Sequence, residues 1–373
     1  MRIAYLDHAA TTPMRPAAID AMQPFLRERF GNPSGAHAMG RDARRAIDDA
    51  RDVIAAAVGC EPGEVVFTSG GTEADNTAIA GARGAVVCSA IEHHAVLEPA
   101  RAAGATVVGV GRDGVIDLDA LAGALHDDVG LVSVMLANNE VGTIQPLADV
   151  SKVVRDLAPR AVVHTDAVQA LPWLDVAQLA RDAALVTITA HKLGGPKGVG
   201  ALVVRAGTPF TPLLRGGGQE RERRAGTQPV ALIAGFAAAV AEVVDERDDT
   251  AARVAPLRDR LVDGLLARID GSAETGSRAT KTPGNAHLCI AGVDADALLF
   301  LLEEQGVLAS AGASCASGAL EMSHVLEAMH VDPELGRGSL RLTLGHETTA
   351  DDVDQALEVV PAAVDRLRRH GGG

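Results

Sequence analysis

The sequence predicts an α/β fold: a large, mostly parallel seven-stranded sheet followed by a smaller C-terminal α+β part. Up to about residue 227, short apolar, β-branched runs alternate with amphipathic stretches of helical period. This alternation is typical of a parallel sheet covered on both faces by helices. The seven predicted strands are residues 64–67, 85–88, 106–110, 131–136, 161–165, 185–189 and 200–204, and the clearest helices between them are 40–58, 118–125 and 147–157.

The pattern changes after residue 227. An alanine-rich helix over 229–244 runs through an acidic stretch into a charged helix over 251–269. Residues 271–285 have the Gly, Ser, Thr and Pro content of a loop. A strand (286–291), a helix (295–305), a Gly/Ser loop around Cys315 and a strand (339–344) follow, which predicts a small α+β domain.

Composition excludes several functional classes. The 34 basic and 49 acidic residues give a net charge of −15, and aromatic residues are only 2% of the chain. Both features argue against a nucleic-acid partner, which needs basic patches and stacking platforms. No run approaches the roughly 18 apolar residues of a membrane helix. The four cysteines form no C-x-x-C pair, so neither a metal site nor a disulfide framework is indicated, and we expect a cytoplasmic protein.

The strand over 185–189 leads directly into Lys192, within a turn rich in Gly and Pro. A partly buried lysine at the carboxyl end of a strand suits covalent catalysis, because burial lowers the pKa of its amine. The alternative is an ordinary exposed loop lysine.

Three further segments bear on this choice. Residues 65–75 (VVFTSGGTEAD) form a strand, a glycine turn and a helix start, where Gly71 and Thr72 could bind a phosphate; a simple N-cap by Ser69 or Thr72 is the alternative. Asp166 ends a buried strand and could pair with a protonated ring nitrogen, or cap the next helix. His93 could stack on a ring or move a proton, or be a polar loop residue.

Taken together, these segments resemble the cysteine desulfurases, pyridoxal 5′-phosphate (PLP) enzymes of the class V aminotransferase group with the type I fold. The resemblance covers nearly the whole chain. Its motifs, in the family's order, are residues 5–13 (YLDHAATTP), 31–34 (GNPS), 67–73 (FTSGGTE), 91–96 (IEHHAV), 138–142 (NNEVG), 164–169 (HTDAVQ), 191–192 (HK), 216–221 (GGGQER), 224–227 (RAGT), 312–315 (GASC) and 338–345 (GSLRLTLG).

The resemblance implies a role for each site residue. Lys192 would bind PLP covalently and later move protons at the substrate Cα, while Asp166 would pair with the pyridine nitrogen. His93 would stack on the ring and act as an acid or base, and Arg341 would bind the substrate carboxylate with help from Asn32. The remaining cofactor ligands would be Gln169 and Asn139 near the phenolic oxygen, and Gly71, Thr72, Thr189 and His191 around the phosphate, joined by Thr227 from the other subunit of a homodimer.

Cys315 distinguishes desulfuration from transamination. By the resemblance, its thiolate would attack the sulfur of the bound L-cysteine, releasing L-alanine and leaving a persulfide on the enzyme. The loop resembles the long form of the desulfurases in iron–sulfur cluster assembly, which implies transfer of the persulfide to an acceptor protein. The alternatives are another PLP lyase or aminotransferase of the same fold, such as a selenocysteine lyase or a cystine C–S lyase, and a non-catalytic sulfur-relay subunit. Some of these enzymes do not require a loop cysteine.

The chain also departs from the family pattern. Thr189-Ala190-His191 replaces the usual Ser-Gly-His, Gly-Ala-Ser-Cys replaces Gly-Ser-Ala-Cys, residues 79–86 are shortened, and the chain ends soon after Leu367. The short C-terminus puts one mode of docking to a cluster scaffold in doubt. The resemblance predicts a large PLP-binding domain over 14–248, and a small domain made of 1–13 and 249–373.

Overall fold

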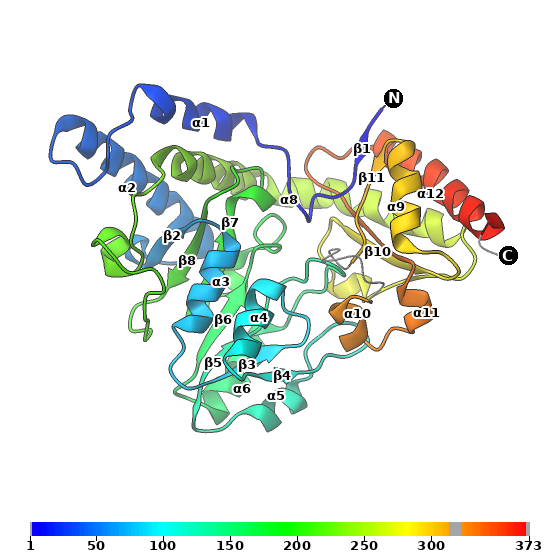
Figure 1. Cartoon of the computed structure of the whole chain (residues 1–373), viewed down its shortest axis with the longest axis horizontal. Coiled ribbons are helices and arrows are strands. Elements are labelled where there is room, and N and C mark those ends of the chain that lie inside the picture. Colours follow the sequence, from blue (N-terminus) through cyan, green and yellow to red (C-terminus); the bar gives the residue numbers. More distant parts are fainter. Residues whose placement is uncertain (1, 313–321, 371–373) are drawn as a thin grey trace.

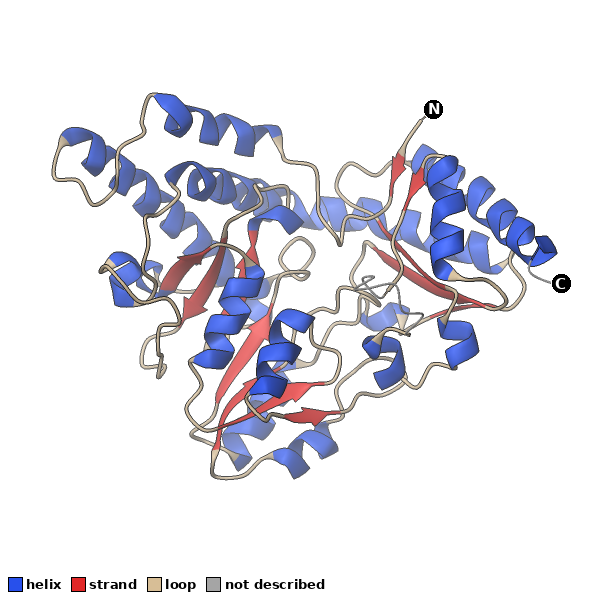
Figure 2. Ribbon diagram, viewed as in Figure 1, coloured by secondary structure: helices blue, strands red, loops and turns tan. Residues whose placement is uncertain are grey.

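A computed structural model describes residues 2–312 and 322–370 and contains the predicted seven-stranded sheet (Figures 1 and 2). Strand β8 is antiparallel to its neighbours β2 and β7, and all other neighbouring strands are parallel. The prediction of a mostly parallel sheet is therefore confirmed. Across the sheet the order is β2 (Val65–Thr68), β8 (Gly200–Val204), β7 (Leu185–Thr189), β6 (Val162–Asp166), β5 (Val129–Ser133), β3 (Ala85–Ser89) and β4 (Thr106–Val108).

The sheet is apolar on both faces because successive strand residues point to opposite sides. On one face Phe67 and Val186 pack with helices α2 (Ala38–Val58), α6 (Leu147–Leu157) and α8 (Val230–Leu266). On the other face Val66 and Leu185 pack with α3 (Gly71–Ala80) and α4 (His94–Ala102). Burial on both faces explains why these strands have continuous apolar sequences.

The second part of the molecule contains a three-stranded antiparallel sheet and a two-stranded parallel one. The orders are β12 (Ser339–Thr343), β10 (Asn285–Ile290), β9 (Ser272–Glu274), and β1 (Ala4–Tyr5) beside β11 (Val307–Leu308). Helices α9 (Ala295–Glu304) and α12 (Ala350–His370) cover these strands (Figure 1). Ala4 and Leu6 belong to the same apolar core, so the N-terminal segment packs with the C-terminal part.

Helix α8 differs from the sequence expectation. Residues 229–244 and 251–269 read as two helical stretches joined by an acidic one, but the structure has a single helix of 37 residues that includes Pro256. Such a helix is about 55 Å long. It packs on α2, beside the large sheet, and on α12 in the second part of the molecule. The predicted domain boundary at residue 248 stays a prediction, and it falls inside this helix.

The remaining elements are short or peripheral. No helix in the described ranges is long and apolar enough to cross a membrane. The predicted loop around Cys315 lies outside the described residues. The other helices are α1 (Pro16–Arg27), α5 (Leu118–Ala124), α7 (Val176–Leu179), α10 (His324–Ala328) and α11 (Pro333–Gly336), with 3-10 turns at Pro62–Glu64, Ala190–Lys192, Gln219–Glu222 and Arg278–Thr280.

A buried ion pair ties the glycine-rich loop before α8 to the sheet. Glu220 has a positive φ of 47° and a carboxylate that accepts hydrogen bonds from Arg51 at 2.8 and 3.0 Å. The main-chain N–H of Phe67 donates to the same carboxylate at 3.0 Å. Since both charged side chains are almost fully buried, each one depends on the other for its stability in the interior.

Arg51→Met removes one charge and leaves Glu220 buried without its partner. We expect the free energy of unfolding to fall by about 3–5 kcal/mol, measured by urea denaturation followed by circular dichroism. Arg29→Met is the control, because the Arg29–Asp42 pair is exposed and contributes less than about 1 kcal/mol. Equal losses for the two variants would contradict the structural role of the buried pair.

Candidate active site

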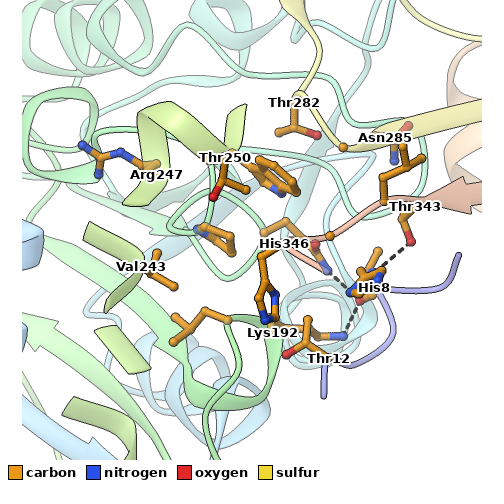
Figure 3. Close-up of a pocket in the computed structure, with 18 of the residues that line it drawn as sticks. His8, Thr12, Lys192, Val243, Arg247, Thr250, Thr282, Asn285, Thr343 and His346 are labelled. Carbon is orange, nitrogen blue, oxygen red and sulfur yellow. Dashed lines mark hydrogen bonds between the residues drawn. The ribbon is translucent and has the colours of Figure 1, made fainter. Parts of the chain in front are cut away.

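Six of the seven large-sheet strands run in one direction, so their carboxyl ends meet at one edge. Ligands bind at this edge in open α/β sheets. Lys192 lies there, in the 3-10 turn after β7. Its Nζ donates to the carbonyl oxygens of Ala9 and Ala10, at 2.6 and 2.7 Å. The N-terminal segment from the second part of the molecule therefore holds the amine, and Figure 3 shows Lys192 beside His8 and Thr12 of that segment.

The surroundings of Lys192 make it a weaker base than a surface lysine. Burial lowers the pKa of its amine to about 8, and the positive charge of Arg341 acts in the same direction. Asp166 and Asp7 oppose this shift through their negative charges. A lysine that is partly neutral near physiological pH fits covalent chemistry better than the alternative of an ordinary loop lysine.

Asp166 ends β6 and is almost fully buried. Its Oδ1 accepts a hydrogen bond from the N–H of Val168 at 2.8 Å. The next helix, α7, begins only at Val176, so Asp166 stabilises a turn and does not cap that helix as the alternative had it. Burial raises the pKa of the Asp166 carboxyl, while the Val168 N–H and the Lys192 charge oppose the rise. A protonated ring nitrogen beside Asp166 would favour the ionised carboxylate as the Lys192 charge does, and the carboxylate would in turn stabilise the protonated ring.

A polar network that sequence reasoning missed lies next to Asp166 on the α3 face of the sheet. His164, two residues earlier on β6, makes hydrogen bonds to Ser133 at 2.9 Å and Thr187 at 3.1 Å, and its Nε2 lies 3.6 Å from Asp75 of α3. Burial lowers the pKa of His164 to about 3 and raises that of Asp75 well above its usual range. His164 is therefore neutral at pH 7, and burial disfavours the ionised form of Asp75. Asp75 is the last residue of the 65–75 motif, and this motif is the one feature of the sequence that indicates it.

The start of α3 lines a cavity, which we call the cradle, at the place where the sequence predicts phosphate binding. Gly70 precedes the helix with a φ of 155°, and no side chain caps the helix, so neither Ser69 nor Thr72 acts as the simple N-cap. A Cβ on Gly71 would lie 3.1 Å from Val168. The cradle, of about 370 Å³, is lined by Gly71, Thr72, Thr189 and His191 as predicted, and also by Ala10, Thr11, Ser69, Gly70, Glu73, Lys197 and Gly198.

His93 caps α4, with its Nδ1 accepting from the N–H of Ala95 at 3.1 Å. His93 is exposed, but desolvation by the surrounding protein and the charge of Lys192 lower the pKa of its ring to about 4. The ring is therefore neutral and carries its proton on Nε2. Gln169 lies beside Lys192 and donates to the carbonyl of Ala9 at 2.9 Å.

Arg341 reaches the same edge from β12 of the smaller sheet. Its Nη1 donates to the carbonyl of Asn139 at 3.2 Å and its Nη2 to Asp7 at 2.9 Å.

Asn32 does not contact Arg341: it is exposed in the α1–α2 loop, where its Oδ1 accepts from the N–H of Ser34. Thr227 is exposed in the loop before α8. The roles of Asn32 and Thr227 therefore stay predictions, and Cys315 lies outside the described residues.

A second cavity lies on the other side of Lys192, between the N-terminal segment, α8 and the loop after β12 (Figure 3). It is lined by Lys192, Trp173, Arg247 and His346, among others. No group of three or more His, Cys, Asp or Glu side chains with metal-binding geometry occurs within residues 2–312 and 322–370.

Comparison with known proteins identifies the family of this chain. Residues 4–356 match the class-V aminotransferase family. An IscS-like cysteine desulfurase of Mycobacterium tuberculosis is 46% identical, with 98% of both chains covered, and a cysteine desulfurase IscS of Methanosarcina thermophila is 41% identical over 98% of this chain and 92% of the relative. A NifS-like protein of known structure superimposes with a TM-score of 0.91 at 35% identity, covering 98% of this chain and all of that one.

The chain belongs to the class-V aminotransferase family, and its architecture is that of the type I fold of PLP enzymes. Within this family, the relatives that it matches over nearly their whole length are cysteine desulfurases.

The lowered pKa of Lys192 predicts selective chemical reactivity in the protein without cofactor. With a pKa near 8 the neutral amine is lost as the pH falls through 8, and at pH 7 it is roughly 300-fold more abundant than for a lysine of pKa 10.5. Trace acetylation across pH 6–11, read by peptide mass spectrometry, should give a midpoint near pH 8 for Lys192. A midpoint at or above pH 10 would show that burial does not weaken this base.

Proposed function

We propose that the chain is a PLP-dependent cysteine desulfurase. It converts L-cysteine to L-alanine, holds the sulfur as a persulfide on Cys315 and passes it to an acceptor. The observation that carries the proposal is the position of Lys192: a partly buried amine of lowered pKa at the carboxyl edge of the sheet, within the electrostatic reach of Asp166 and Arg341. The names of the relatives support the choice of L-cysteine as substrate.

The residues present fit the cofactor. The start of α3 lines the cradle and has no side-chain cap, so its first N–H groups are available to bind a phosphate. Thr72, Thr189 and His191 line that cradle and would hold the phosphate. Asp166 would offer a buried carboxylate to the pyridine nitrogen, and Gln169 and Asn139 would hydrogen-bond near the phenolic oxygen. When bound, PLP withdraws electrons from the substrate Cα.

The protein's own groups then supply binding and proton transfer. Arg341 binds the substrate carboxylate, which guanidinium geometry favours. Lys192, once free, removes and returns the proton at Cα, because a base with a pKa near 8 exchanges protons readily at neutral pH. His93 is neutral at this pH, so it can stack on an aromatic ring without placing a second positive charge beside Lys192.

The sulfur step involves Cys315, assigned here from the sequence motif. Its thiolate attacks the substrate Sγ, so that an S–S bond forms and the substrate Cβ–Sγ bond breaks. The electron pair of the broken bond stays with the carbon fragment, which takes up a proton and leaves as L-alanine. One L-cysteine and one enzyme thiol thus give one L-alanine and one persulfide, with no added oxidant. We place this chemistry in the cytoplasm, consistent with the free thiols of Cys60, Cys88 and Cys289.

The proposal is tested by measuring L-alanine and sulfide from purified, PLP-loaded protein given L-cysteine with and without dithiothreitol. Wild type should form L-alanine, with sulfide released only with the reductant. Lys192→Ala should lower turnover by at least about 10²- to 10⁴-fold, since it removes the acid–base group. Cys315→Ser should abolish turnover, while the matched control Cys60→Ser should retain it. Full turnover by Cys315→Ser would replace desulfuration with a direct C–S lyase reaction, and a protein that takes up no PLP would overturn the proposal.

We also propose a homodimer in which Thr227 reaches the phosphate of the partner's site. Its support is an apolar surface on α1 and the following loop, where Leu26 is 60% and Phe30 71% exposed. Exposed apolar side chains that gather in one region mark interaction sites.

Light scattering should give twice the mass of one chain for the wild type. Phe30→Asp should weaken the dimer at least tenfold, because it places a charge in the apolar contact. Phe300→Asp is the matched control: Phe300 is 62% exposed but lies on α9, away from α1 (Figure 1), so the mass should not change. A monomeric wild type would contradict the proposed assembly.

A further inference from the structure

The guanidinium of Arg341 is shared between the site and the N-terminal segment. Arg341 is only 6% exposed, and two of its three nitrogens have partners, the Asn139 carbonyl on Nη1 and the Asp7 carboxylate on Nη2. The third, Nε, is buried and has no hydrogen-bond partner among the described residues. A buried N–H without an acceptor is costly, so this guanidinium retains the capacity to bind one more acceptor.

Asp7 can leave Arg341 without displacing its own segment. The segment is held by contacts that do not involve the Asp7 side chain: a parallel bridge between Asp7 and Thr343, a hydrogen bond from the N–H of Ala9 to Thr343 Oγ1 at 2.9 Å, and hydrogen bonds from the Tyr5 hydroxyl to the carbonyls of Asp7 and Thr11, at 3.1 and 2.8 Å. The Asp7 side chain is 20% exposed, against 7% for that of Arg341, so Asp7 also has access to water.

We propose that Asp7 competes with the substrate carboxylate for Arg341 and so limits the affinity of the site for amino acids. The inference rests on the proposed function, in which Arg341 binds that carboxylate. A bidentate carboxylate needs two N–H groups of one guanidinium, and Asp7 already engages one nitrogen of this fork. A second anion on the same guanidinium also meets the charge of Asp7 at short range, and like charges repel.

The competition acts equally on substrate and product. L-cysteine and L-alanine carry the same α-carboxylate, so Asp7 weakens the binding of both and favours product release. At the same time its negative charge balances Arg341 beside Lys192 when no ligand carboxylate is bound. An interaction that weakens uniform binding raises KM and does not by itself slow the chemical step.

The test uses Asp7→Asn, which keeps the shape and removes the charge. Calorimetry on PLP-loaded protein would measure binding of 3-mercaptopropionate, which has a thiol and a carboxylate but no amine. Affinity should rise at least fivefold over wild type, and KM for L-cysteine should fall by a similar factor. For cysteamine, which has no carboxylate, the apparent affinity should stay the same in both proteins.

Two variants separate charge from structure. Asp7→Glu keeps the charge and should retain the weak, wild-type affinity for 3-mercaptopropionate. Tyr5→Phe removes two hydrogen bonds from the same segment without changing any charge, and should bring no gain in affinity. Asp7→Ser also removes the charge and serves in place of Asp7→Asn if the latter does not fold.

In the protein without cofactor, the midpoint of Lys192 acetylation should move to lower pH in Asp7→Asn, since a negative charge near the amine is lost. Unchanged or weaker binding of 3-mercaptopropionate by Asp7→Asn, or an equal gain for cysteamine, would overturn the inference. If the wild type does not turn over L-cysteine while Asp7→Asn still binds the carboxylate more tightly, the proposed function fails and the competition at Arg341 stands.

Discussion

The hydrogen bonds from Lys192 to the carbonyls of Ala9 and Ala10 are the contact on which the site depends. Two main-chain dipoles fix the amine in position without pairing it with a full negative charge. Burial is therefore free to lower its pKa. The arrangement also forces the N-terminal segment, which packs in the core of the smaller part, to extend across to the large sheet. The two parts consequently form one site between them.

Burial also affects the ionisation of the acidic side chains near Lys192. Asp75 and Glu92 are fully desolvated, which raises the pKa of both carboxyls well above their usual range. Asp166 has the N–H of Val168 and the charge of Lys192 to favour its ionised form. Asp166, at the end of β6, is thereby better placed than Asp75 or Glu92 to carry negative charge, at the position where a cationic ring would benefit from it.

The parts of this structure that local patterns define were predictable. The strands over 185–189 and 200–204 have the predicted bounds, since their apolar runs end sharply. Lys192 and Asp166 could be predicted as candidate site residues because they lie at or just after the ends of strands. Strand β1 has only two residues, too few for a periodicity. The contact of Asp7 with Arg341 joins residues 334 positions apart, and no local pattern carries such a pairing. Asp75 was missed because a polar residue in a helix reads as solvent-exposed.

The long-range pairing of the N-terminal segment has a consequence for biosynthesis. Ala9 and Asp7 are made before their partners Thr343 and Arg341, which come 334 positions later. At about 5–20 residues per second, a ribosome needs roughly 20–70 s to produce them. The large sheet can form meanwhile, but the segment that holds Lys192 is not anchored to β12 until that strand has been made. The order of synthesis thus delays a working site until β12 has left the ribosome.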